Sequence, residues 1–156
     1  MTGDDAVAIR RPVAGSLGEP PPAPAGSFAP SRERHHLFLM ATCVLIVDDE
    51  RDIRDAITEL LSEEGYEVHG ASDGAEALTK ARDFHPGLVL LDLMMPGMDG
   101  WEFRDRQRVD PELAGIPVVV LSALGRVPGV DAAAYLQKPF ELDDLLTAVR
   151  VHAHAA

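Results

Sequence analysis

The stretch that decides the fold is VLIVDDE at residues 44–50, an apolar run that ends in three acids. Three later stretches also place polar residues at the end of an apolar run. They are LVLLD at 88–92, which leads into MPGMDG at 95–100, then VVVLSA at 118–123, and YLQKPF at 135–140. The carboxyl ends of parallel strands meet at one edge of a sheet, where ligands and chemistry are found. We therefore expect the polar ends of these stretches to form one site.

Helical patterns separate the predicted strands. Apolar residues recur at helical spacing from Ile53 to Leu61, and Gly65 stands where that helix would end. Asp73, with Glu76 three residues later, predicts the start of a second helix. A third is expected from Asp99 and a last one over 142–149. Together with a short strand at 66–71, this alternation predicts an α/β fold with a doubly wound, five-stranded parallel sheet.

Composition divides the chain near residue 40. Residues 1–40 hold six of the twelve prolines and lack sustained periodicity, so they are predicted to be a disordered Pro/Gly/Ala-rich tail. Residues 41–156 are predicted to form the folded domain. Alternatively, Met40 is the natural start of the protein. Under either interpretation, residues 1–39 are expected to contribute nothing to folding.

Charge and cysteine content limit the partners and the compartment. Residues 41–156 hold 22 Asp and Glu against 10 Lys and Arg, a balance that repels nucleic acid. The single cysteine, Cys43, excludes a disulfide within the chain, which suits a reducing cytoplasm. The apolar stretch at 37–47 is too short to span a bilayer. We expect a cytoplasmic protein that binds neither nucleic acid nor membrane.

The acids at the predicted sheet edge define the chemistry. Asp48, Asp49 and Asp92 would lie a few ångströms apart and repel one another, so the site must hold a proton or bind a cation. Mg²⁺ fits, because it prefers oxygen ligands, needs few from the protein, and can take others from water or a phosphoryl group. The sequence therefore predicts Mg²⁺ as the cofactor.

In order and approximate spacing across residues 41–156, these stretches resemble the receiver domain of two-component response regulators. The resemblance implies the flavodoxin-like strand order 2-1-3-4-5. It also implies that Asp92 is a nucleophile that takes a phosphoryl group from a sensor histidine kinase or a histidine phosphotransfer protein. Asp49 and Asp92 would bind Mg²⁺ directly, the Met94 backbone carbonyl would add a third ligand, and Asp48 would act through water. The sequence does not identify the downstream partner.

The resemblance assigns roles to three further residues. Lys138 would bind the phosphoryl oxygens, aimed by a cis peptide to Pro139. Ser122 would bond the phosphoryl group through its hydroxyl, or else be only a helix N-cap. Ser122 and Tyr135 together would form the switch that converts phosphorylation into a conformational change.

Two positions are expected to tune hydrolysis of the phosphorylated form. In the family, side chains two residues beyond the phosphorylated Asp and two beyond the Ser or Thr orient or block the attacking water. Here these positions are the apolar Met94 and Leu124, which predict a slow loss of phosphate. The chain would thus catalyse its own phosphorylation and slow autodephosphorylation, with no separate enzymatic output.

The segment between Ser122 and Lys138 departs from the family. It is shorter than usual by roughly one and a half helical turns, and its two glycines and internal proline are poor helix formers. We expect the fourth helix to be shortened or absent. Only residues 151–156 follow the last predicted helix, which favours a stand-alone receiver.

Two other functions remain open. A degenerate receiver would bind a protein partner independently of phosphorylation, and the shortened fourth-helix region favours it. A phosphohydrolase of the haloacid dehalogenase type also uses a strand-end Asp and Mg²⁺. It would place its nucleophile after the first strand in an Asp-x-Asp pattern, whereas Asp48 and Asp49 are adjacent.

Overall fold

The fold is a five-stranded parallel sheet in the order β2-β1-β3-β4-β5, as predicted. The computed structural model describes residues 42–153, so the expected tail at 1–40 lies outside the described residues. The strands are β1 (Cys43–Val47), β2 (Glu67–Ala71), β3 (Leu88–Asp92), β4 (Val118–Ser122) and β5 (Ala134–Gln137). The helices of the described part are α2 (Arg51–Glu63), α3 (Gly74–Phe84), α4 (Gly100–Val109) and α5 (Leu142–His152). None of them is long and apolar enough to cross a membrane.

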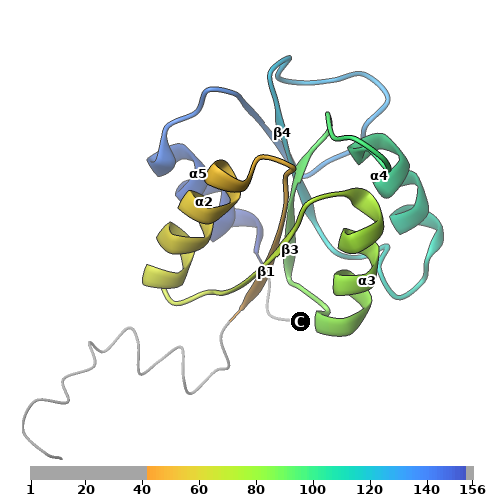
Figure 1. Ribbon diagram of the computed structural model, residues 1–156, viewed down its shortest axis with the longest axis horizontal. Coiled ribbons are helices and arrows are strands. Elements are labelled where there is room, and N and C mark those ends of the chain that lie inside the picture. The colour runs from red at the N-terminus through yellow and green to blue at the C-terminus, as the bar shows by residue number, and fades with distance from the viewer. Residues whose placement is uncertain (1–41, 154–156) are drawn as a thin grey trace, which may run out of the picture. The chain divides into compact units, whose positions relative to one another are not determined.

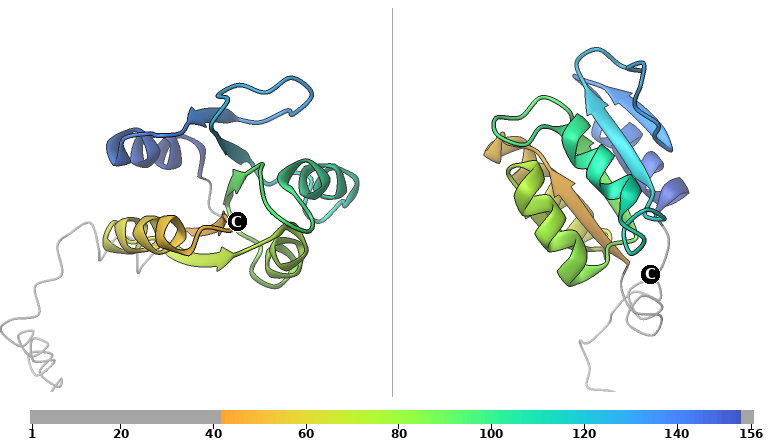
Figure 2. Two further views of the ribbon diagram at one scale, coloured as in Figure 1. Left: turned by 45° about the horizontal axis from the view of Figure 1, so that its top comes forward. Right: turned by 90° about the vertical axis from the view of Figure 1, so that its right-hand side faces the viewer.

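Helices cover both faces of the sheet. Helices α2 and α5 lie on one face, and α3 and α4 lie on the other (Figures 1 and 2). Strands β1, β3 and β4 are almost entirely buried because apolar side chains alternate between the two cores. In β1, for example, Leu45 and Val47 pack toward α3 and α4, whereas Val44 and Ile46 pack toward α2 and α5. The central strands therefore form a rigid base for the residues at their carboxyl ends.

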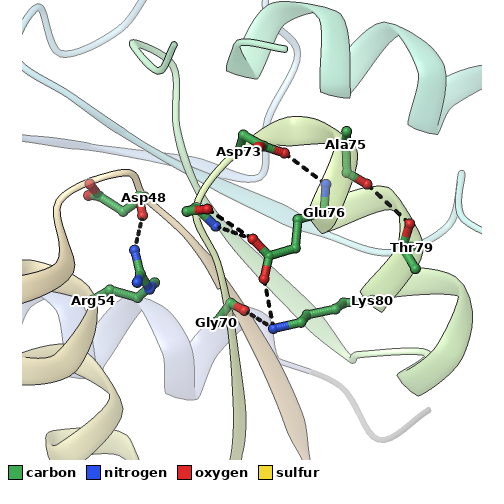
Figure 3. A network of polar contacts seen from close by, with 9 residues as sticks. Asp48, Arg54, Gly70, Asp73, Ala75, Glu76, Thr79 and Lys80 are labelled. Atoms are coloured by element: carbon green, nitrogen blue, oxygen red, sulfur yellow. Dashed lines mark hydrogen bonds and ion pairs between the residues drawn. The ribbon is translucent and has the colours of Figure 1, made fainter. Parts of the chain in front are cut away.

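A polar network fixes the turn from β2 into α3 (Figure 3). Asp73 Oδ1 accepts a hydrogen bond from the Glu76 N–H at 2.8 Å, as the sequence predicted. The Glu76 carboxylate in turn accepts from the backbone N–H and hydroxyl of Ser72, and Lys80 Nζ lies 3.0 Å from it. The backbone hydrogen bond from Ser72, above all, lowers the pKa of Glu76 to about 2.

The helix that the sequence predicted to be shortened or absent, between β4 and β5, is absent. Residues 123–133, between β4 and β5, form turns and no helix. Gly125 and Gly129 adopt positive φ angles of 70° and 85°, which a helix does not accommodate. The loop is nevertheless held in place, because the Tyr135 hydroxyl donates to the Val130 carbonyl and Arg104 Nε donates to the Asp131 carbonyl at 2.9 Å.

Candidate functional site

The parallel sheet brings the predicted site residues to one edge. Asp92 is the last residue of β3 and Ser122 the last residue of β4. Asp48 follows β1 directly, and Lys138 follows β5 directly. Because β1, β3, β4 and β5 are successive neighbours in the sheet, these four side chains come together at its carboxyl end. The expected site is therefore present as a structural cluster.

The three acids converge as predicted. One carboxylate oxygen each from Asp48, Asp49 and Asp92 lies within 4.8 Å of the others. Asp48 is fully buried and Asp92 is only 5% exposed, whereas Asp49 faces solvent. Asp92 Oδ1 accepts a hydrogen bond from the Met94 N–H at 3.2 Å. The cluster thus has two fixed, buried carboxylates and one on the solvent side.

Asp48 is held by more contacts than the sequence suggested. Its Oδ1 accepts from the Glu50 N–H at 2.8 Å. Its backbone carbonyl accepts from Arg54 Nη1 at 2.7 Å, a contact drawn in Figure 3. Sequence reasoning missed Arg54, whose only signal is its place in the first turn of the helix that follows the acids.

Lys138 lies between the two buried carboxylates. Its Nζ is 3.0 Å from Asp48 Oδ2 and 3.5 Å from Asp92 Oδ2. The Lys138–Pro139 peptide is cis, as the resemblance implied. The Lys138 backbone N–H donates to the Ser122 carbonyl at 2.9 Å, which ties the start of this turn to the end of β4. The ammonium group is therefore positioned to contact any group added to Asp92.

The electrostatics of the cluster follow from burial and crowding. Burial raises the pKa of Asp92, and Asp48 and Asp49 raise it further against the opposing charge of Lys138. Burial opposes the charge of Lys138, but its hydrogen bond to Asp48 and the nearby carboxylates outweigh burial and raise its pKa. The site thus holds more negative charge than Lys138 neutralises.

The donor set fits a hard divalent cation. The cluster offers carboxylate oxygens and no sulfur or nitrogen ligand, which suits Mg²⁺. Asp49 is exposed, so an ion can reach the cluster from solvent. An ion there would also balance the excess negative charge.

Ser122 and Tyr135 differ in how closely they approach the cluster. Ser122 is buried at the edge, and its hydroxyl oxygen accepts from the Leu124 N–H at 3.0 Å. No helix follows Ser122, so it caps a turn and is not a helix N-cap. Tyr135 pairs with Val120, two residues before the end of β4, and its hydroxyl donates to the Val130 carbonyl in the adjacent loop. The Arg126 guanidinium stands 5.9 Å over the Tyr135 ring.

Met94 and Leu124 flank the site on its solvent side. Met94 is 65% exposed and Leu124 is 72% exposed, so both apolar side chains lie largely in solvent. Neither side chain can hold a water molecule by a strong hydrogen bond.

Gly100 is a positioning residue that sequence reasoning missed. A Cβ at this position would lie 2.6 Å from the Asp92 carbonyl oxygen and 2.6 Å from Leu93 Cα. The Gly100 N–H donates to the Leu93 carbonyl at 3.0 Å. The close approach of α4 to the end of β3 therefore requires glycine here, and it sets the path of the loop beside Asp92.

A largely apolar cavity of about 400 Å³ adjoins the site. It lies between α2 and the segment after β5 and includes Lys138 in its wall. Its other lining residues are Ile53, Ala56, Ile57, Pro139, Phe140 and Leu142. The sequence did not indicate this cavity, because it forms only where α2 and the start of α5 lie side by side.

Comparisons with known proteins identify the family of the chain. The family described as "Response regulator receiver domain" matches residues 44–150. RpaA of Synechocystis, named a DNA-binding dual master transcriptional regulator, is 40% identical over 113 residues, which cover 69% of this chain and 47% of that protein. The response regulator MprA of Mycobacterium sp. strain KMS is 41% identical over 117 residues, or 71% of this chain and 50% of MprA. The chain thus spans about half the length of these relatives.

Solved structures give the same result. The chemotaxis protein CheY4 of Vibrio cholerae superposes with a TM-score of 0.67 at 33% identity, over 72% of this chain and 98% of CheY4. A receiver domain of a histidine kinase from Syntrophus aciditrophicus superposes with a TM-score of 0.66 at 28% identity, over 71% of this chain and 89% of that one. In sequence and strand order alike, this chain belongs to the receiver domain family of response regulators.

Proposed function

We propose that the chain accepts a phosphoryl group on Asp92 from a sensor histidine kinase or a histidine phosphotransfer protein, and that it signals by a conformational change. The main support is the Asp92 carboxylate, which is buried between the Met94 N–H and the Lys138 ammonium beside two further acids. Family membership favours the same role. The single cysteine favours the cytoplasm as the site of action.

In the proposed reaction, a carboxylate oxygen of Asp92 attacks the phosphorus of a phosphohistidine. The bond from phosphorus to the imidazole nitrogen breaks, and the leaving imidazole takes a proton from solvent. Asp92 then carries an acyl phosphate. Lys138 stabilises the phosphoryl oxygens through its positive charge, without a covalent role. The buried position of Asp92 limits its rotation and fixes its direction of attack.

Mg²⁺ is proposed as the cofactor of this reaction. Asp49, Asp92 and the Met94 backbone carbonyl would hold it, and Asp48 would act through water. When bound, Mg²⁺ supplies positive charge that neutralises the carboxylates and the incoming phosphoryl group. Lys138 already engages Asp48 at 3.0 Å, which leaves Asp49 and Asp92 as the freer ligands.

The proposed switch begins at Ser122. Its hydroxyl oxygen accepts from Leu124, and the hydroxyl hydrogen is left to donate to a phosphoryl oxygen on Asp92. Movement of Ser122 toward that group would pull on the loop at 123–133. Because Tyr135 is tied to this loop through Val130, its ring would respond. In this proposal, the loop at 123–133 transmits the signal in place of a helix between β4 and β5.

The apolar cavity beside Lys138 supports a protein as the phosphoryl donor. A donor must bring its phosphohistidine to Asp92, so its surface has to cover the rim of the site. One part of that rim is the wall formed by Ile53, Ala56 and Phe140. Apolar surface of this kind is suited to a protein partner. We propose that the described domain binds proteins and not nucleic acid, because its excess of acids repels nucleic acid.

Phosphorylation by a small donor tests the proposed function. We expect incubation with acetyl phosphate and Mg²⁺ to add one phosphoryl group, measured as intact mass. A degenerate receiver would gain no mass. A phosphohydrolase would release phosphate from added phosphoesters, and no stable phosphorylated protein would accumulate.

Replacing Asp49 with Ala should weaken Mg²⁺ binding more than any other single change outside Asp92. We expect millimolar affinity in the natural protein, as for an exposed site with few protein ligands, and a loss of at least about tenfold in the variant. Isothermal calorimetry measures both. Asp52→Ala, an exposed acid three residues further on, is the matched control and should bind Mg²⁺ normally. Unchanged affinity in Asp49→Ala would refute the ligand assignment.

The aspartyl phosphate is expected to last well beyond seconds. Hydrolysis needs a water in line with the phosphorus, and neither Met94 nor Leu124 can orient one. Met94→Asn should therefore speed the loss of phosphate several-fold, with Leu124→Glu as a second test. Phosphorylated protein is followed by intact mass after removal of the donor, and Val109→Asn, an exposed apolar residue at the end of α4, is the control. A natural lifetime of seconds, or no effect of Met94→Asn, would contradict this expectation.

A further inference from the structure

A second group of potential ligands lies at the opposite end of the sheet from Asp92. Cys43, Glu67 and His69 bring a sulfur, a carboxylate oxygen and an imidazole nitrogen within 4.8 Å of one another. Cys43 at the start of β1 pairs with Glu67 at the start of β2, and His69 follows on the same face of β2. We propose that these three side chains form a metal site that binds Zn²⁺ or a closely similar transition-metal ion.

The donor types select the metal. A thiolate, an imidazole and a carboxylate are the ligands that Zn²⁺ takes in proteins, usually in a tetrahedral arrangement. Three protein ligands leave the fourth position to water. The site at Asp92 offers oxygen alone and suits Mg²⁺, so the two sites differ in the ions that they prefer.

The imidazole is held in place before any ion binds. The His69 ring stacks on Phe84 with a centroid separation of 3.6 Å and an angle of 13° between the planes. Its Nε2 lies 2.8 Å from Glu67 Oε1. An ion bound to both atoms would replace this hydrogen bond, with the ring hydrogen on Nδ1 and the two atoms about half an ångström further apart. The stack on Phe84 fixes the plane of the ring.

Cys43 is the ligand whose deprotonation opposes metal binding most strongly. Burial raises the pKa of its thiol to about 11, and the charge of Glu67 adds to the effect. The sulfur therefore keeps its proton at neutral pH until an ion displaces it, and that proton passes to solvent. The Glu67 side chain is 54% exposed and that of His69 is 23% exposed, so an ion can reach the sulfur from this side.

The proposed site is separate from the Asp92 cluster. Strand β1 begins at Cys43 and reaches the acids only after Val47, so the two groups lie about 16 Å apart along the strand at roughly 3.3 Å per residue. A metal ion here would link the edge strand β2 to the central strand β1. Its binding does not depend on phosphorylation of Asp92.

Cobalt titration of the full chain tests the proposal. A thiolate bound to Co²⁺ gives a charge-transfer absorption in the near ultraviolet, and Cys43 is the only cysteine in the chain. The band therefore reports this site alone, whatever the acids and other histidines bind. With excess Mg²⁺ present to fill the Asp92 cluster, we expect one Co²⁺ per chain to produce the band and Zn²⁺ to remove it.

Variants then separate a three-ligand site from binding to the thiol alone. His69→Gln and Glu67→Gln should each weaken Co²⁺ binding at least about tenfold. The controls are His85→Gln and Glu59→Gln, two exposed residues outside the group, and they should leave it unchanged. Glu67 is exposed, so Glu67→Gln keeps the test valid even if loss of the ring stack in His69→Gln disturbs the fold, as judged by circular dichroism. Absence of the band, or a band unaffected by both ligand variants, would overturn the proposal.

Discussion

Replacing Asp92 with Asn should abolish phosphorylation completely. The amide lacks the anionic oxygen that attacks phosphorus, and no other acid of the cluster lies both at a strand end and between the Met94 N–H and Lys138. Intact mass after incubation with acetyl phosphate and Mg²⁺ should show no added phosphoryl group. Asp105→Asn, an exposed acid on α4, is the matched control and should be phosphorylated normally. A phosphoryl group found on Asp92→Asn would show that another residue is the acceptor.

The same variant should be at least as stable as the natural protein without divalent ions. Burial and the neighbouring acids raise the pKa of Asp92 above its ordinary value of 3.8. An acid with a raised pKa in the folded state stabilises the fold below its unfolded pKa, and that contribution is lost as the pH rises through the folded pKa. At neutral pH the charged carboxylate therefore opposes folding, and Asn removes this effect. Urea unfolding would show that lost phosphorylation does not reflect lost folding.

The sequence predicted the elements whose signals are local. Apolar runs that end in Asp92 or Ser122 indicated buried strands, and the structure confirms both. Asp73 predicted the start of α3 because an N-cap depends only on the next few residues. The absence of a helix after Ser122 was also predictable, since Gly125 and Gly129 lie too close together for a stable helix.

Contacts that depend on tertiary packing were not predictable. The bond from Arg54 to the Asp48 carbonyl depends on how α2 is rotated over β1. The link between Tyr135 and Val130 depends on the path of a loop with no regular structure. Cys43 stands in an apolar stretch of the sequence, yet it is only partly buried and lies beside Glu67. Strand register alone brings these two residues together.

Charge balance explains why the proposed function would use both Lys138 and a cation. Two buried carboxylates and one exposed carboxylate face a single ammonium group. Burial raises the pKa of Asp92, and the repulsion that Lys138 does not offset raises it further. The buried charge of Asp92 therefore lowers the stability of the domain, and it leaves the proposed nucleophile held in place and poorly solvated. A bound ion or a change of charge at any of these residues should alter folding as well as phosphorylation.

Replacing Lys138 with Met should cost about 3 kcal/mol of unfolding free energy in the absence of divalent ions, because it leaves the fully buried Asp48 carboxylate without its partner. Methionine keeps a similar volume, so the change removes mainly charge. Urea unfolding measures the loss. Lys80→Met is the matched control: it removes a more exposed ion pair with Glu76, and it should cost less than about 1 kcal/mol.

Two further measurements identify the cause as uncompensated charge. Millimolar Mg²⁺ should restore much of the stability of Lys138→Met, because the ion supplies the missing positive charge. Lowering the pH should also reduce the loss of unfolding free energy. Because the pKa of Asp92 is raised, its carboxylate takes up a proton at a higher pH than an ordinary aspartate does. Phosphorylation should stay slow even when Mg²⁺ restores folding, because the ammonium that is proposed to contact the phosphoryl oxygens is absent. A loss no larger than that of Lys80→Met, or one insensitive to both Mg²⁺ and pH, would show that Lys138 does not balance the charge of the buried acids.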